Sequence, residues 1–253
     1  IIDHTADLVA AVKPQAAFYE EFGWAGMKAL EETANYARSK NLLVIMDAKR
    51  GDIPNTALAY SRAYLASDVN RHAFPCDALT VNPFLGRDGL EHFVNAAARN
   101  QRGIFLLIRT SNPGAADLQN LTVQETKQPV WQEIATWVAT WAEETKGADN
   151  YSPVGVVVGL THPSEAKTLR QLLPHSYLLL PGLGVQGGRI ADALPCFDNN
   201  GLGAVLVAAR SIIFAFSREP YNSAFSPDEF GAAARQATID VLSSLKAAGY
   251  PLR

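Results

Sequence analysis

The stretch that decides the fold runs Leu42-Leu43-Val44-Ile45-Met46-Asp47-Ala48-Lys49-Arg50-Gly51-Asp52-Ile53-Pro54-Asn55-Thr56. Its first half is an unbroken apolar run, which is typical of a strand that is buried on both faces of a parallel sheet. Gly51 then allows the chain to turn, and Pro54 can begin a helix. The stretch therefore predicts a strand–turn–helix unit with charged residues at the carboxyl end of its strand.

Short apolar runs alternate with helical patterns along the rest of the chain, and no low-complexity linker divides them. Repeated units of this kind imply parallel strands joined by right-handed crossovers, which is an α/β fold. The predicted strands are Leu8–Lys13 (at its end only), Leu42–Asp47, Ala78–Asn82, Gly103–Arg109, Val154–Gly159, Tyr177–Pro181 and Ala204–Ala208. The predicted helices are Trp24–Ser39, Asn55–Arg71, Gly89–Asn100, Pro129–Thr145, Pro163–Leu172, Arg189–Phe197 and Pro227–Ala248.

An open doubly wound sheet and a closed TIM (β/α)8 barrel both fit this pattern. The length of 253 residues suits one barrel domain spanning residues 1–253, although a TIM barrel has eight strands and the pattern supplies one fewer. The chain opens with a helix-like segment, Ile1–Ala10, that leads into a strand. We therefore expect a (β/α) barrel whose first strand is missing from the sequence and would precede Ile1.

Composition excludes several classes of partner. A formal net charge of −3 gives no reason to expect nucleic acid. The apolar run Gly203–Ala209 is cut by Arg210 and is too short to cross a bilayer. Cys76 and Cys196 lie far apart and show no metal-like or redox-like spacing, so we expect reduced thiols in a cytoplasmic protein. No cluster of His, Asp and Glu has the spacing of a metal site.

Asp47 and Lys49 are the strongest candidates for chemistry. Strand side chains alternate between faces, so these two should point the same way at the carboxyl end, which is the catalytic face of a barrel. A carboxylate beside a lysine favours the charged amine, while burial opposes it. The pair predicts a protonated, semi-buried lysine that acts as an acid rather than a nucleophile. An ordinary ion pair that closes the end of the barrel is the alternative interpretation.

The run from Asp47 to Thr56 resembles the signature of the orotidine 5′-monophosphate decarboxylases. The resemblance implies that Lys49 protonates C6 of the pyrimidine and that Asp47 lies against the substrate carboxylate. It also implies a homodimer, because in that family the residues in the places of Asp52, Ile53 and Thr56 reach into the site of the partner subunit.

Further segments are similar to the same family and extend the site. The resemblance implies that Lys13 joins an alternating network of lysines and aspartates and that Ser111 binds the base. It also implies that Gln186 contacts both phosphate and base and that Arg210 binds phosphate. It also implies the longer, type 2-like subgroup, on the segments Val81–Gly86 and Asp88–Glu91. The predicted catalytic set is Lys49, Asp47, Asp52 and Lys13. The predicted substrate-binding set is Ile53, Thr56, Asn82, Ser111, Pro181, Gln186, Gly187 and Arg210.

The phosphate site is also plausible without the family. Barrels often bind phosphate with the loops that follow their last two strands, and glycine-rich turns and arginine forks suit that ligand. Pro181–Gly188 and Arg210 follow the last two predicted strands. One departure from the family is the absence before Ile1 of the strand whose aspartate binds the ribose.

The resemblance implies decarboxylation of orotidine 5′-monophosphate to uridine 5′-monophosphate, the last step of de novo UMP synthesis, without metal or cofactor. A Mg²⁺-dependent sugar-phosphate decarboxylase or aldolase of the same superfamily would share the Asp-x-Lys-x-x-Asp pattern, but Lys13 occupies the place of its extra carboxylate. A Schiff-base aldolase would use Lys49 as a nucleophile. A nucleotide-binding barrel without catalysis is a third alternative.

Two other groups of residues predict structural roles. Trp131, Trp137 and Trp141 lie near helical spacing, which favours a packed helix face. His162 follows a predicted strand without an evident partner in the sequence. We therefore predict that His162 has a structural role.

Overall fold

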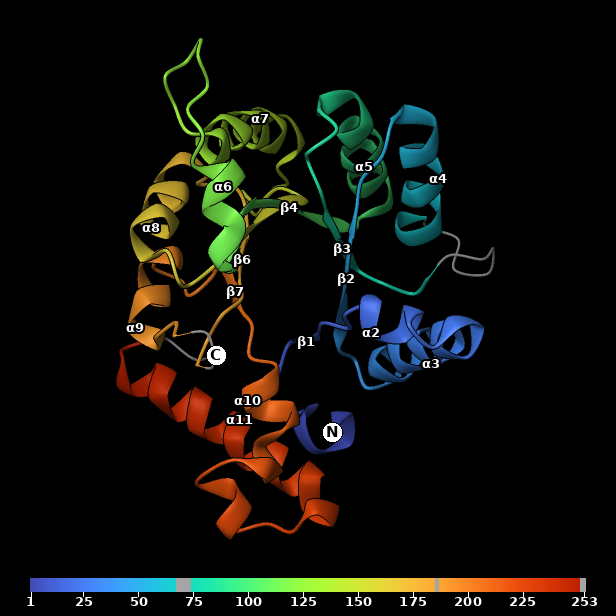
Figure 1. The fold of residues 1–253 in the computed structure, drawn as a ribbon, viewed down its shortest axis with the longest axis vertical. Helices are drawn as coiled ribbons and strands as arrows, with labels where there is room; N and C mark the ends of the chain where they lie inside the picture. The colour runs from blue at the N-terminus through green and yellow to red at the C-terminus, as the bar shows by residue number, and fades with distance from the viewer. Residues whose placement is uncertain (67–73, 185–186, 251–253) are drawn as a thin grey trace.

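The computed structural model describes residues 1–66, 74–184 and 187–250. Its sheet curves through the middle of the molecule with the longer helices on its outside (Figure 1). All neighbouring strands are parallel and pair in the order of the sequence, as the repeated strand–helix units predict. The strands are β1 (Ala11–Val12), β2 (Leu43–Arg50), β3 (Ala78–Val81), β4 (Gly103–Arg109), β5 (Val154–Val158), β6 (Leu178–Leu180) and β7 (Ala204–Leu206).

Seven strands make up the sheet within the described residues, and β1 and β7 are its two edges. Sequential parallel pairing with a crossover between successive strands is the topology of a (β/α) barrel, so the α/β barrel expectation is confirmed. The helices are α1 (Ile2–Thr5), α2 (Ala17–Glu20), α3 (Gly23–Ser39), α4 (Pro54–Leu65), α5 (Arg87–Asn100), α6 (Ala116–Gln119), α7 (Val130–Thr145), α8 (Pro163–Leu172), α9 (Ile190–Ala193), α10 (Arg210–Ile213) and α11 (Phe230–Ala247).

Several predicted helical segments are longer than the observed helices, and the one expected over Pro227–Ala248 begins as a 3₁₀ turn, Pro227–Glu229, before α11. The helix expected to reach Arg71 ends at Leu65, because Ala66 adopts an extended backbone (φ −66°, ψ 147°); residues 67–71 of that prediction lie outside the described residues. The segment expected to be helical from Ile1 to Ala10 is helical only in α1. The helix expected over residues 189–197 divides into α9 and a 3₁₀ turn, where Pro195 lacks the N–H that a continued helix needs.

The interior of the barrel follows from the two-residue period of the strands. One buried cluster contains one inward side chain from each of five consecutive strands: Ile45, Ala78, Phe105, Val157 and Leu179. Two residues farther along β2 and β3, the same face carries Asp47 and Thr80, both of which are buried. The intervening residues, such as Val44 and Met46, pack outward in the larger core that joins the sheet to the helices. The packed interior therefore ends in polar groups at the carboxyl end of the strands.

Close backbone packing holds the turn after β2 against α5. A Cβ atom on Gly89 would lie 2.2 Å from the backbone oxygen of Asp52, so only glycine allows this approach. The polypeptide from Gly51 to Ile53 therefore rests directly on the helix that follows β3. In the described part of the chain, no helix is long and apolar enough to cross a membrane.

Candidate active site

A local irregularity at the end of β2 sets the direction of Lys49. The pairing of β2 with β3 shifts register between Met46 and Arg50, and Lys49 adopts a left-handed backbone (φ 47°). Lys49 Nζ donates to Asp47 Oδ1 at 2.6 Å. The predicted neighbourhood of Asp47 and Lys49 is confirmed, although it arises through an irregular strand end instead of simple alternation.

Arg50 points away from this pair and anchors the outside of β2. Its guanidinium forms an ion pair with Glu20 of α2 and donates to the hydroxyl of Tyr64 at 3.2 Å. It also lies over the rings of Tyr60 and Tyr64 on α4, at 5.4 and 5.7 Å. These contacts tie the strand end to two helices on the side opposite Lys49.

The carboxylate of Asp47 is the centre of the site. The residue is 7% exposed. An ionised carboxylate has about four acceptor positions, and four side chains donate to this one. The donors are Lys13 Nζ (2.5 Å) and Gln15 Nε2 (3.3 Å) on Oδ2, and Lys49 Nζ (2.6 Å) and Thr80 Oγ1 (3.0 Å) on Oδ1.

Electrostatics keep this carboxylate ionised. Burial alone would raise the pKa of Asp47, but the ammonium groups of Lys13 and Lys49 outweigh it and hold the pKa below the usual 3.8. The result is a row of three fixed charges in the order Lys13, Asp47 and Lys49, with the two cations on opposite oxygens of one anion. Such a row can stabilise a negative charge that develops next to either ammonium group.

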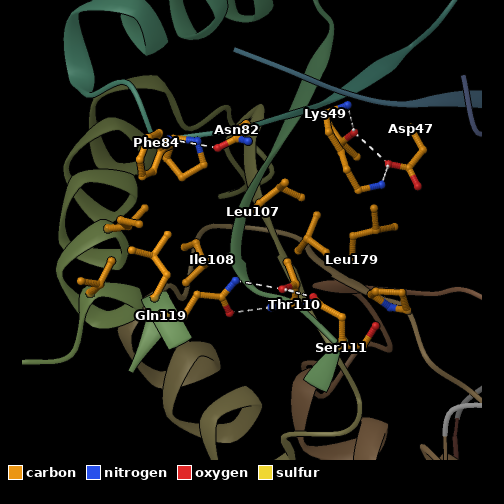
Figure 2. Close-up of a pocket in the computed structure, with 18 of the residues that line it drawn as sticks. Asp47, Lys49, Asn82, Phe84, Leu107, Ile108, Thr110, Ser111, Gln119 and Leu179 are labelled. Atoms are coloured by element: carbon orange, nitrogen blue, oxygen red, sulfur yellow. Dashed lines mark hydrogen bonds and ion pairs between the residues drawn. The ribbon is translucent and has the colours of Figure 1, made fainter. Parts of the chain in front are cut away.

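A cavity of about 890 Å³ opens beside this row. Figure 2 shows Asp47 and Lys49 across the cavity from Thr110 and Ser111, with Asn82 and Phe84 at another side. Part of the wall is apolar, and Arg87 stacks over the ring of Trp137 at 4.8 Å. The apolar lining includes Phe84, Leu118, Val123, Val130, Ile134 and Trp137.

The loop that carries Ser111 is held by α6. Gln119 accepts a hydrogen bond from the backbone N–H of Thr110 (3.0 Å) and donates one to its hydroxyl (2.8 Å). A Cβ atom on Gly159 would lie 2.8 Å from Cα of Ser111, so the end of β5 packs directly under the loop. Ser111 is therefore presented to the cavity from a backbone that is fixed on two sides.

Arg109 lies buried beneath this loop at the end of β4. Its guanidinium is 3.2 Å from Nδ1 of His162 and 3.6 Å from Glu165, both at the start of α8, and it donates to Gln119 at 3.3 Å. Burial and the neighbouring Arg109 lower the pKa of His162. His162 does not line the cavity within the described residues, and its interpretation as a structural residue stays a prediction.

Six residues of the predicted set line the cavity: Lys13, Asp47, Lys49, Asn82, Ser111 and Pro181. Five others do not line it in the described part of the chain: Asp52, Ile53, Thr56, Gly187 and Arg210. Gln186 lies outside the described residues. The glycine loop and the start of α10 nevertheless meet, because a Cβ atom on Gly184 would lie 3.9 Å from Cβ of Ser211.

Sequence reasoning missed several residues of the site. Gln15 and Thr80 contact Asp47 directly, and Gln119 holds the Ser111 loop. Thr80 could have been found, because it lies two residues after Ala78 on the inward face of β3. Trp137 packs against the core, as its helical spacing predicts, and in addition lines the cavity, which the sequence did not indicate.

Over the described ranges, no group of three or more His, Cys, Asp or Glu side chains is arranged as metal ligands.

Comparisons with known proteins agree with the resemblance. The model of the "Orotidine 5′-phosphate decarboxylase / HUMPS family" matches residues 1–220. An orotidine 5′-phosphate decarboxylase of Rhodopirellula baltica is 46% identical over 247 residues, which cover 97% of this chain and 81% of the relative. The structure of Leishmania donovani OMP decarboxylase matches with a TM-score of 0.76 and 28% identity, over 98% of this chain and 84% of that one. Leishmania donovani UMP synthase matches with a TM-score of 0.76 and 29% identity; 97% of this chain is covered, but only 49% of that longer chain.

The lowered pKa of Asp47 predicts a pH-dependent contribution to stability. Because the folded pKa lies below 3.8, the ionised group stabilises the fold above about pH 3.8, and this contribution is lost as the pH falls through the folded pKa. Asp47→Asn leaves Lys13 without its partner and should lower the free energy of unfolding by about 2–4 kcal/mol at pH 7. Urea titrations of both proteins from pH 7 to pH 3 should show this difference shrinking below about pH 3.8.

Glu143→Gln is the matched control, because Glu143 pairs with Lys146 at an exposed surface. Its effect on stability should be small at every pH. A stability difference for Asp47→Asn that stays constant down to pH 3 would contradict the assigned charge of Asp47.

Proposed function

The chain belongs to the orotidine 5′-phosphate decarboxylase / HUMPS family, and from this premise we propose that it decarboxylates orotidine 5′-monophosphate to uridine 5′-monophosphate. The observation that carries the proposal is the charged row of Lys13, Asp47 and Lys49 at the wall of the cavity. The curated relatives bear the decarboxylase name, which favours this reaction over the sugar-phosphate, aldolase and non-catalytic alternatives.

The proposed chemistry needs no electron sink from a cofactor. When CO2 leaves C6, the electron pair of the broken carbon–carbon bond stays on the ring carbon. The ammonium group of Lys49 stabilises this negative charge and then transfers a proton to C6, which leaves a neutral amine that regains a proton from solvent. Asp47 holds Lys49 by a 2.6 Å hydrogen bond, and Lys13 balances the charge of Asp47 from its other oxygen.

The remote end of the substrate would be bound by the other predicted residues. Ser111 and Pro181 both line the cavity, and in this proposal Ser111 binds the pyrimidine. We assign the phosphate to the glycine loop that contains Gly187, and to Arg210. The approach of Gly184 to Ser211 supports this assignment, since it places the loop beside the segment that carries Arg210. Phosphate binding there would help to order the loops around the reacting carbon.

We also propose a homodimer in which Asp52, Ile53 and Thr56 complete the site of the partner subunit. None of the three lines the cavity of its own chain in the described structure. Asp52 Oδ1 accepts a hydrogen bond from the backbone N–H of Ile53 at 2.8 Å. Ile53 is 60% exposed, although it is large and apolar. Its side chain is therefore accessible for contact with a partner subunit. The cytoplasmic location stays a prediction from the sequence.

The first experiment follows the loss of absorbance of orotidine 5′-monophosphate with purified protein in EDTA. We expect turnover without added metal, and we expect Lys49→Ala to lower it on the order of a thousandfold or more, because the charge-stabilising group and proton donor is gone. Lys246→Ala, an exposed lysine in α11, is the matched control and should retain activity. Folded protein that does not turn over orotidine 5′-monophosphate, either in EDTA or with added Mg²⁺, would favour the sugar-phosphate branch of the superfamily and overturn the proposal.

Subunit complementation tests the assignment of Asp52 to the partner's site. Lys49→Ala and Asp52→Ala are each expected to be nearly inactive alone. Mixed dimers would contain one intact site, so an equal mixture of exchanged subunits should recover about a quarter of the wild-type activity.

The matched control combines Lys49→Ala with Asp47→Ala. Both residues line the cavity of their own chain, so no mixed dimer has an intact site and activity should stay low. If the Asp52 mixture also stays inactive although mixed dimers have formed, Asp52 does not act in trans.

A further inference from the structure

Lys49 occupies a backbone position that needs support from outside its own strand. Its φ of 47° lies in the left-handed region, which a residue with a side chain rarely adopts. The register between β2 and β3 also shifts at this point, with Met46 opposite Leu79 and Arg50 opposite Val81. At this irregular point the N–H of Lys49 bonds to a side chain of the neighbouring strand. That hydrogen bond helps to hold the left-handed conformation of Lys49.

The hydroxyl of Thr80 accepts this hydrogen bond. Lys49 N donates to Thr80 Oγ1 at 2.9 Å, and Thr80 Oγ1 donates to Asp47 Oδ1 at 3.0 Å. The same Oδ1 atom accepts the hydrogen bond from Lys49 Nζ at 2.6 Å. One hydroxyl thus connects the backbone of the lysine to the carboxylate that holds its side chain. The three residues form a closed ring of hydrogen bonds.

Thr80 is well suited to transmit this constraint. It is 1% exposed, and its neighbours Leu79 and Val81 in the middle of the sheet are fully buried. A β-branched side chain in a packed strand has a restricted χ1 angle, so the hydroxyl oxygen keeps one direction. Because its one proton goes to Asp47, the oxygen presents its lone pairs to the N–H of Lys49. The position of β3 therefore helps to determine the direction in which Lys49 points.

We propose that Thr80 is a positioning residue that fixes the backbone of Lys49, and through it the place of the Lys49 ammonium group at the reacting carbon. This inference deepens the proposed decarboxylation and rests on it. Thr80 lies at the wall of the cavity but is only 1% exposed, and its hydroxyl is engaged by Lys49 and Asp47, so it acts through these two residues. Loss of its hydroxyl therefore lowers the rate of the chemical step and leaves substrate binding almost unchanged, because only the placement of the proton donor suffers.

Three variants separate this role from simple packing. Thr80→Val keeps the shape and removes both hydrogen bonds, so kcat should fall on the order of tenfold to a hundredfold while KM changes less than about threefold. Thr80→Ser restores the hydroxyl and should recover kcat to within about threefold of wild type. Thr238→Val is the matched control: Thr238 is 2% exposed and donates to the backbone oxygen of Ala234 in α11, so its loss should leave kcat unchanged.

A second readout does not depend on catalysis. With ¹⁵N-lysine labelling, the backbone amide of Lys49 should exchange slowly with D2O in wild type and Thr80→Ser, and at least about tenfold faster in Thr80→Val. If Thr80→Val does not fold, Thr80→Ala replaces it in both the kcat and the amide-exchange measurements. An amide that exchanges equally in all variants, or a Thr80→Val enzyme with wild-type kcat, would overturn the inference.

The two proposals fail in different ways. A wild-type protein without decarboxylase activity, but with a Lys49 amide that loses protection in Thr80→Val, would refute the proposed function and keep the structural role of Thr80. An active wild type whose Thr80→Val variant keeps both kcat and the protection of the Lys49 amide would keep the proposed function and refute the role of Thr80.

Discussion

The site depends on one buried carboxylate. Asp47 lies on the inward face of β2 and accepts hydrogen bonds from residues that follow β1, from β2 itself and from β3. A buried charge without partners would be strongly unfavourable, so the three segments must keep their relative register for Asp47 to stay ionised. Conversely, the ionised carboxylate holds Lys13 and Lys49 at the cavity, one on each of its oxygens. The packing of the barrel and the electrostatics of the site are therefore set by the same contacts.

Much of this arrangement could be predicted from the sequence. The apolar run that ends in Asp47 indicates a buried parallel strand, and a period of two places Asp47 and Lys49 on one face. The structure shows the predicted ion pair between Asp47 and Lys49. The alternation of strands and helices gives the sequential order of the sheet, and helix α8 has the bounds that its sequence signals predict. These features depend on local periodicity, which a sequence shows directly.

Features that depend on contacts between strands could not be read in the same way. The left-handed backbone of Lys49 arises where the register between β2 and β3 shifts, and no single residue of the sequence predicts that shift. The period of two places Thr80 on the inward face of β3, but its hydrogen bond to the backbone of Lys49 is visible only in the structure. Gln119 lies in a short helix without a periodic pattern, so its hydrogen bonds to Thr110 could not be predicted. Asp52 lies outside the lining of its own cavity in the described structure, which periodicity does not indicate and only the family resemblance implied.

The most direct test of the account is a crystal structure with uridine 5′-monophosphate bound. The charged row predicts that C6 of the pyrimidine lies within hydrogen-bonding distance of Lys49 Nζ, about 3 Å, with Asp47 still held by Lys13 and Thr80. A pyrimidine bound instead against the apolar wall at Phe84 and Trp137, away from Lys49, would contradict the central role given to the Lys13–Asp47–Lys49 row.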